Sequence, residues 1–192
     1  VDRRGGPEEK QLGFDTVSKI KAYAALASAS RNTENELYIT EVNWPLKEMN
    51  RWSPSAEYLI EESLQSSYLI RYYLLMLASG KVKKCYWHQL VAPGYGLVNN
   101  LDGEIKKRDA YFCFKHLISI LSNGKIKKFI KEKKLYCLIV EKEHTIIEAV
   151  WSSDGNVSFK SQPCQQIFDI RGKAIETKNS PMIEISGEVI YI

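Results

Sequence analysis

Hydrophobic residues recur along the chain at two different spacings, and the spacing changes near residue 124. Before this point, apolar positions with helical spacing alternate with short apolar runs that are typical of buried strands. We therefore expect helices over roughly 15–30, 53–79 and 108–122, with strands at 37–42 and 82–89. Beyond residue 124 the apolar runs are short and separated by turn signals, which predicts strands only. These strands are expected near 126–131, 135–141, 145–151, 156–160, 164–169, 173–177, 182–185 and 188–192.

Residues with capping preferences mark the ends of the predicted helices. Asp15 is expected to cap the first helix, and Ser53 followed by Pro54 is expected to begin the second. Both choices follow from the preference for oxygen-bearing side chains at the cap and for proline at the first helical position. Gly80 and Gly124 are expected to end the second and third helices, because glycine adopts the left-handed backbone found there.

The alternation of helix and strand before residue 124 predicts an α/β fold, and the strands after it predict a small antiparallel β-sandwich. Two strands cannot form a stable sheet among three helices, so further strands are expected upstream. The chain begins Val-Asp-Arg-Arg without an initiator methionine, which suggests a fragment of a longer protein.

The composition is that of a globular protein, with 44% hydrophobic and 26% charged residues. The formal net charge of +4 is too small to indicate a nucleic-acid-binding protein by itself. The longest apolar run, Tyr68 to Ala78, is interrupted by Arg71 and is too short to span a membrane. Neither a nucleic acid nor a membrane is therefore expected as a partner.

Positive charge is concentrated between Lys125 and Lys134. Lysines on an edge strand discourage pairing with other sheets, and this solvated edge is the favoured interpretation. A patch that binds polyanions is the alternative.

The cysteines and histidines form no motif with metal-ligand spacing. Free thiols are expected at the cysteines, and they favour a reducing compartment without excluding export. No metal or organic cofactor is expected. The residues concerned are Cys85, Cys113, Cys137, Cys164, His88, His116 and His144.

Three motifs in a fixed order resemble the end of the catalytic barrel of clan A glycoside hydrolases. Ile39-Thr-Glu-Val-Asn-Trp-Pro45 resembles the seventh strand, and Tyr86-Trp-His-Gln89 resembles the eighth. Tyr95-Gly-Leu-Val98, Asp102-Gly103 and Arg108-Asp-Ala-Tyr-Phe112 resemble the passage into the eighth helix. Within this clan, the three motifs most resemble those of glycoside hydrolase family 39 and its relatives.

The resemblance implies the C-terminal part of a (β/α)8 TIM barrel over residues 1–123, followed by a β-sandwich accessory domain over 124–192. It implies a retaining glycosidase in which Glu41 is the nucleophile. Its acid/base would be an upstream glutamate in an Asn-Glu pair. The pair Asn35-Glu36 precedes the seventh strand and lies on the wrong side of it. The chain alone is therefore expected to be inactive, and no cofactor is implied.

The residues around Glu41 are candidates for binding the carbohydrate substrate. Trp87 has a flat face for stacking on a sugar ring, and the polar residues at the strand ends have hydrogen-bonding groups for its hydroxyls. The remaining candidates are Asn43, Trp44, His88, Gln89 and Tyr95.

Each candidate also has a structural interpretation. Glu41 could be held in an ion pair at the barrel rim, Trp87 could be a core indole, and His88 could be a structural hydrogen-bonding group. Trp44 could pack beside Pro45.

Two further alternatives concern the chain as a whole. A carbohydrate-binding or assembly module without catalysis would keep the fold and use Glu41 structurally. The surface left by the missing strands could also drive self-association. In the tail, Trp151, Phe159 and Phe168 are expected in the sandwich core, with exposure for sugar binding as the alternative.

Overall fold

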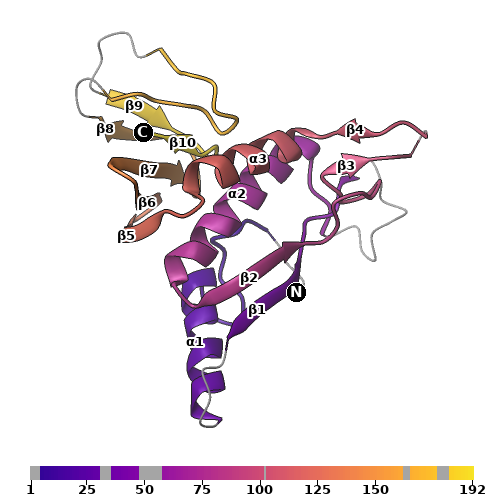
Figure 1. Ribbon diagram of the computed structural model, residues 1–192, viewed down its shortest axis with the longest axis horizontal. Coiled ribbons are helices and arrows are strands. Elements are labelled where there is room, and N and C mark those ends of the chain that lie inside the picture. Colours follow the sequence, from indigo (N-terminus) through magenta and orange to yellow (C-terminus); the bar gives the residue numbers. More distant parts are fainter. Residues whose placement is uncertain (1–4, 31–35, 48–57, 102, 162–164, 177–181) are drawn as a thin grey trace. The chain divides into compact units, whose positions relative to one another are not determined.

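A computed structural model of the protein describes residues 5–30, 36–47, 58–101, 103–161, 165–176 and 182–192. The chain forms two compact units, Val1–Tyr111 and Phe112–Ile192. Helices and strands are mixed, as the pattern predicts (Figure 1). The elements are α1 (Thr16–Ala29), β1 (Leu37–Val42), α2 (Glu62–Ser79), β2 (Val82–Trp87), β3 (Val98–Asn99), β4 (Lys106–Lys107), α3 (Asp109–Leu121), β5 (Lys125–Glu132), β6 (Leu135–Lys142), β7 (Thr145–Ser152), β8 (Val157–Lys160), β9 (Met182–Ile185) and β10 (Ile190–Tyr191).

In the first unit, β1 and β2 pair in parallel, as expected for strands joined by a helical crossover. Leu37 lies opposite Val82 at one end of the pair, and Val42 lies opposite Trp87 at the other. The crossover helix α2 contacts both α1 and β2, and Figure 1 shows β1 and β2 side by side. The two strands therefore end at the same edge of this small sheet.

The predicted caps at Asp15 and Gly80 are confirmed, whereas the left-handed residue after α3 is Asn123, with a φ of 63°, and not the predicted Gly124. The carboxylate of Asp15 accepts the backbone N–H of Ser18 at 2.8 Å, which supplies a partner at the start of α1. Gly80 follows α2 with a φ of 62°, a left-handed conformation that costs little in a residue without Cβ.

The predicted start of the second helix is wrong. The helix begins at Glu62, because the backbone of Ile60 is already engaged with the segment after β1. The Ile60 N–H donates to Pro45 O at 2.9 Å, and its carbonyl accepts the Lys47 N–H at 3.0 Å. Ser53 and Pro54, the expected first residues, lie outside the described residues.

The charge that interrupts the apolar run of α2 is buried in an ion pair. Arg71 and Glu8 both have side chains that are 5% exposed, and Arg71 Nε donates to Glu8 Oε1 at 2.9 Å. A buried guanidinium needs such a partner, since an unpaired buried charge is strongly destabilising. The pair attaches the N-terminal segment to the middle of α2.

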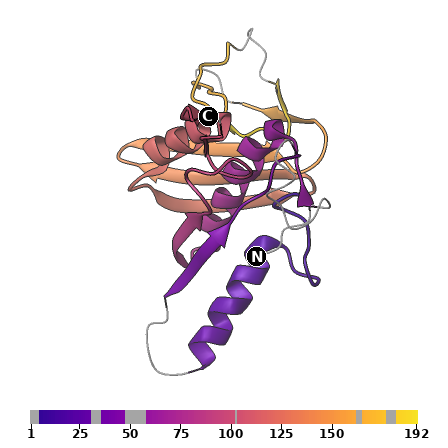
Figure 2. The same cartoon turned by 90° about the vertical axis from the view of Figure 1, so that its right-hand side faces the viewer.

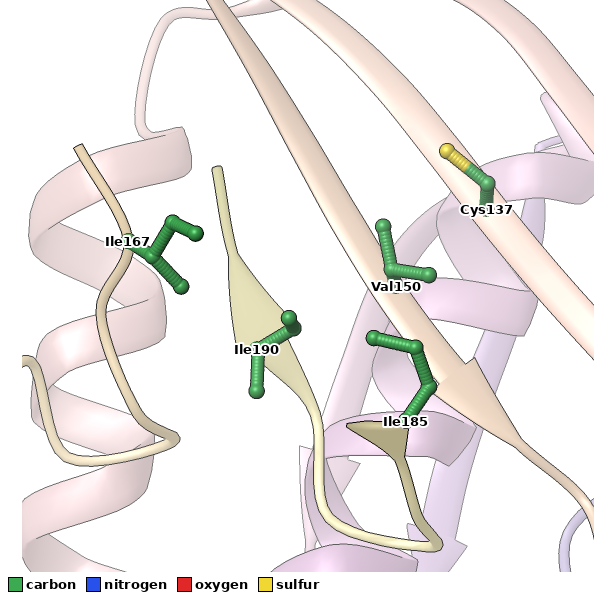
Figure 3. Packing of buried hydrophobic residues seen from close by; sticks show 5 residues of the cluster. All are labelled: Cys137, Val150, Ile167, Ile185 and Ile190. Atoms are coloured by element: carbon green, nitrogen blue, oxygen red, sulfur yellow. The ribbon is translucent and has the colours of Figure 1, made fainter. Parts of the chain in front are cut away.

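The second unit contains a four-stranded antiparallel sheet in the order β10-β7-β6-β5 and a separate antiparallel pair, β8-β9. Figure 2 shows the long strands of the sheet, drawn in orange, lying side by side. Side chains from the sheet and from β9 meet in a buried cluster, together with one residue of the segment before β9 (Figure 3). Its members are Cys137, Val150, Ile167, Ile185 and Ile190.

The residues that alternate with this cluster along the strands are buried on the opposite face of the sheet. Trp151 is fully buried there, and its ring stacks on that of Tyr136 at a centroid distance of 5.3 Å. Tyr191 alternates with Ile190, and its ring meets that of His116 of α3 edge-on at 5.2 Å. The expectation that Trp151 is a core residue is confirmed.

The strands expected at 164–169 and 173–177 are not formed in the described residues. Phe168 makes isolated bridges to Ala174 and Tyr191 instead. Between the two bridge positions the carboxylate of Asp169 accepts the N–H groups of Arg171 and Lys173, which closes a tight turn. Cys164 and Thr177, at the outer ends of the two expected strands, lie outside the described residues.

The lysine-rich segment is β5, at the edge of the four-stranded sheet. Lys127 pairs with Glu141 at 3.1 Å, and Lys134 pairs with Asp154 at 2.6 Å. The ammonium group of Lys131 lies 5.5 Å from the ring centroid of Tyr136. These contacts favour the edge-strand interpretation over a polyanion-binding patch.

The three described cysteines are thiols outside any disulfide, and Cys113 and Cys137 are buried. Burial raises the pKa of the Cys137 thiol to about 12, so it remains protonated and unreactive. No helix in the described ranges combines the length and apolarity that a membrane span requires.

We expect Ile185→Ala to lower the free energy of unfolding by about 2–5 kcal/mol, because the side chain is fully buried and its loss leaves a cavity. Met182→Ala on the same strand is the control: that side chain is 49% exposed, and its loss should change the free energy by no more than about 0.5 kcal/mol. Urea denaturation followed by circular dichroism measures both. Equal effects of the two substitutions would contradict the assigned core.

Candidate active site

The candidate site lies where the parallel strands β1 and β2 end. Glu41 is the penultimate residue of β1, and Trp87 is the last residue of β2. The backbone pairing continues past the strands, because the His88 N–H donates to Val42 O at 3.0 Å. The sequence motifs that contain Glu41 and Trp87 are therefore brought together at one edge.

Among the described residues, the imidazole of His88 approaches the carboxylate of Glu41. The two side chains approach to 3.8 Å between Glu41 Oε1 and His88 Nε2. The Glu41 side chain is 58% exposed and that of His88 is 31% exposed. The other ring nitrogen, His88 Nδ1, is buried without a hydrogen-bond partner in the described structure. The carboxylate is thus accessible from solvent on one side and flanked by a ring on the other.

Asn43 fixes the polypeptide that carries His88. Its Nδ2 donates to the carbonyl of His88 at 2.6 Å, so the side chain positions the backbone. The next peptide bond, His88–Gln89, is cis. Gln89 is exposed at the rim, and its carbonyl accepts the Leu97 N–H at 3.4 Å.

Trp44 lies beneath this surface. Its side chain is fully buried, and its Nε1–H donates to Gly5 O at 3.0 Å. Its ring stacks on Trp87, with a centroid distance of 6.2 Å, and meets Tyr68 edge-on at 5.4 Å. This burial favours the packing interpretation of Trp44.

Trp87 and Tyr95 complete the aromatic part of the site. Trp87 Nε1 donates to Tyr95 O at 3.2 Å, which ties the strand end to the glycine-rich loop. The ring of Tyr95 lies 5.5 Å from that of His88. Both aromatic residues are half-buried. Their exposed ring surface is apolar, and each ring also has a polar group at its edge.

The sequence motifs do not point to the residues that hold this loop. Gln65 of α2 donates to Tyr95 O at 3.3 Å, and Arg108 Nη2 donates to Pro93 O at 2.7 Å. Arg108 also pairs with Glu62. An alanine at Gly96 would place its Cβ 2.3 Å from the backbone N of Ala92, so only glycine fits there. In the sequence, the glycines of this loop are the only sign that its backbone segments pack closely together.

Glu36 cannot act together with Glu41. It lies before the start of β1, where it pairs with Lys83 at 2.6 Å. Five residues of extended chain separate the two carboxylates, which corresponds to about 16 Å. A retaining pair requires about 5–5.5 Å. The structure thus agrees with the placement of Asn35-Glu36 on the wrong side of the strand; Asn35 itself lies outside the described residues.

The site has no metal-binding cluster in the part of the chain that is described. No group of three or more His, Cys, Asp or Glu residues is arranged to hold an ion. Asp102, of the Asp102-Gly103 motif, lies outside the described residues.

A solved structure with a similar fold is a family 39 glycoside hydrolase from the gut symbiont Bacteroides cellulosilyticus WH2. The TM-score is 0.77 at 13% sequence identity, over 99% of this chain and 42% of the other. The likeness shows the fold, which is that of part of the larger protein. No protein-family model matches the chain, and no curated protein matches it significantly.

We expect Arg108→Met to loosen the loop that carries Tyr95. The loss of a buried charged hydrogen bond costs about 1.5–3 kcal/mol, so the Gly96 and Val98 amides should exchange at least about tenfold faster. Hydrogen–deuterium exchange read by NMR measures this. The control is Lys107→Met, one residue earlier, because Lys107 is exposed and contacts the ring of Tyr111. Unchanged protection in Arg108→Met would show that the loop is held by other contacts.

Proposed function

We propose that the chain is the C-terminal part of a retaining glycoside hydrolase, with Glu41 as the nucleophile. The observation that carries the proposal is the position of Glu41. It is a solvent-accessible carboxylate at the C-terminal edge of a parallel strand pair, in a fold similar to part of a family 39 glycoside hydrolase. The C-terminal edge of parallel strands is where barrel enzymes place catalytic residues.

The geometry supports a specific division of roles. The exposed carboxylate of Glu41 would attack the anomeric carbon and form a covalent glycosyl-enzyme. His88, at 3.8 Å, would orient that carboxylate, and Asn43 would hold His88 through its carbonyl. Trp87 and Tyr95 would contact the apolar face of the sugar. Gln89 is exposed at the same rim and is available to its hydroxyls.

Hydrolysis also needs a general acid/base, which this proposal assigns to a glutamate outside the 192 residues. The chain spans 42% of the family 39 enzyme that it resembles. The 192-residue chain alone is therefore proposed to be inactive on unactivated glycosides. This part of the proposal fails if the purified chain turns them over rapidly.

We expect activated 2-deoxy-2-fluoro-glycosyl fluorides to label Glu41. Fluoride leaves without protonation, so the nucleophile can react even when the acid/base is missing. The 192-residue chain and the full-length gene product are incubated with a panel of sugars, and the labelled peptide is located by mass spectrometry. Glu41→Gln should abolish the label. The matched control is Glu36→Gln, at the far end of the same strand, which should leave the label unchanged.

A label on another carboxylate would keep the enzyme class and remove Glu41 from its role. The absence of any label, combined with binding of the same sugars, would favour the second candidate function. That candidate is a carbohydrate-binding or assembly module. The approach of His88 Nε2 to Glu41 Oε1 at 3.8 Å is the observation that favours it, because a carboxylate beside a histidine side chain can serve a structural role.

We further propose that the chain self-associates through the exposed apolar side chains of α1. On α1, Tyr23 is 54% exposed and Leu26 is 66% exposed. Exposed apolar patches of this kind mark interaction sites.

Leu26→Lys should shift the chain towards the monomer in sedimentation-velocity runs over a range of concentrations, because a buried charge disfavours an apolar contact. Ile105→Lys is the control, since Ile105 is 74% exposed and lies just before β4. A parent chain that sediments as a monomer at every concentration would contradict the proposal.

A further inference from the structure

A second candidate site lies wholly within the C-terminal unit. It is a cavity of about 430 Å³. Its walls come from α3, β7, β10 and the segment that contains Phe168 and Gly172. This volume falls within the range of about 300–1,000 Å³ that is typical of small-molecule sites.

The described walls are predominantly apolar and carry no charged side chain. Within the described part of the chain, the lining includes Ile120, Ile146, Ile147, Phe168 and Ile192, and it includes no Asp, Glu, Lys or Arg. A charged molecule that entered such a space would lose its hydration without gaining a counter-ion. The cavity therefore suits a neutral guest.

Two polar atoms in the walls are buried without partners among the described residues. They are the hydroxyl of Tyr191 and the Nε2 atom of His116, whose rings lie 5.2 Å apart. Burial lowers the pKa of His116, although the nearby Asp169 opposes the effect, so the imidazole is neutral at neutral pH. Buried polar groups without partners are uncommon and costly. Each could be satisfied by one hydrogen bond from a guest.

Local features of the chain place both atoms at the cavity. Strand alternation directs Ile190 into the hydrophobic cluster and Tyr191 to the opposite face, and Phe168 is held beside Tyr191 by a backbone bridge. Gly172 makes room for the imidazole, because a Cβ at this position would lie 2.5 Å from the ring of His116. The φ of Gly172, +87°, also favours glycine.

We propose that this cavity binds a neutral, largely apolar small molecule that carries a hydrogen-bonding group, held by Tyr191 and His116. The apolar body of the ligand contacts the isoleucines and Phe168. Its polar group pairs with the Tyr191 hydroxyl or with His116 Nε2. This site is separate from Glu41 and does not depend on the function proposed for it.

Three probes of similar size test the proposal: 4-propylphenol, propylbenzene and 4-propylbenzoate. Each is titrated into the 192-residue chain, and binding is read from NMR shifts of backbone amides around the cavity. The phenol should bind more tightly than propylbenzene by roughly two- to tenfold, which is the contribution of one hydrogen bond. The benzoate should bind more weakly than both, because its charge is desolvated.

Two substitutions assign the binding to the cavity. Tyr191→Phe removes the unpaired hydroxyl and keeps the ring, so it should narrow the difference between phenol and propylbenzene. Ile146→Trp adds bulk at a lining residue that is 50% exposed, and it should abolish binding of all probes. Ile126→Trp is the matched control, because Ile126 is 41% exposed on β5 and does not line the cavity. This variant should bind the three probes as tightly as the parent chain does.

The proposal is overturned if no probe binds up to millimolar concentration. It is also overturned if Ile146→Trp and Ile126→Trp bind the phenol equally, or if the benzoate binds as tightly as the phenol. Each of these outcomes is independent of any result at Glu41, because the titrations contain no glycoside.

Discussion

The parallel pairing of β1 with β2 is the constraint on which the candidate site depends. It sets Val42 opposite Trp87 after a shift of register between Ile39 and Val42, and the pairing continues to the hydrogen bond between His88 and Val42. Residues that are more than forty positions apart in sequence therefore end at one edge. A shift of one residue in this pairing would move the side chain of Glu41 to the other face of the strand, away from His88.

An exposed site of this kind needs a rigid layer beneath it. The fully buried Trp44 supplies this layer, because its indole contacts Trp87 and its Nε1–H is bonded to the backbone of Gly5. The buried ion pair of Arg71 with Glu8 holds the same N-terminal segment against α2. Side chains that have lost their own freedom can position others without a further entropic cost at binding.

In the C-terminal unit, one alternation of side chains produces two environments. Ile190 and Val150 face the hydrophobic cluster, whereas Tyr191 faces α3 and the cavity. On the opposite face, Tyr191 meets His116 of α3, and the Tyr191 hydroxyl and His116 Nε2 have no partner among the described residues. The two faces of this sheet thus differ in chemistry although they share a backbone.

The sequence alone determined the elements with strong local signals: the strand at 37–42, the strand expected at 82–89 and observed at 82–87, the Asp15 cap, the Gly80 stop and the strand-only tail. It also placed Glu41 and Trp87 at strand ends, since strand termini follow from local composition. The start of α2 depended on the tertiary structure, because Ile60 bonds to Pro45 and Lys47 instead of its helical neighbours. The same holds for Gln65 and Arg108, which support a loop that lies thirty and fifteen residues away in the chain. The spacing of hydrophobic residues gives information only about residues that are close in the sequence. These contacts and the cavity form between segments that are distant in the sequence, so only the tertiary structure shows them.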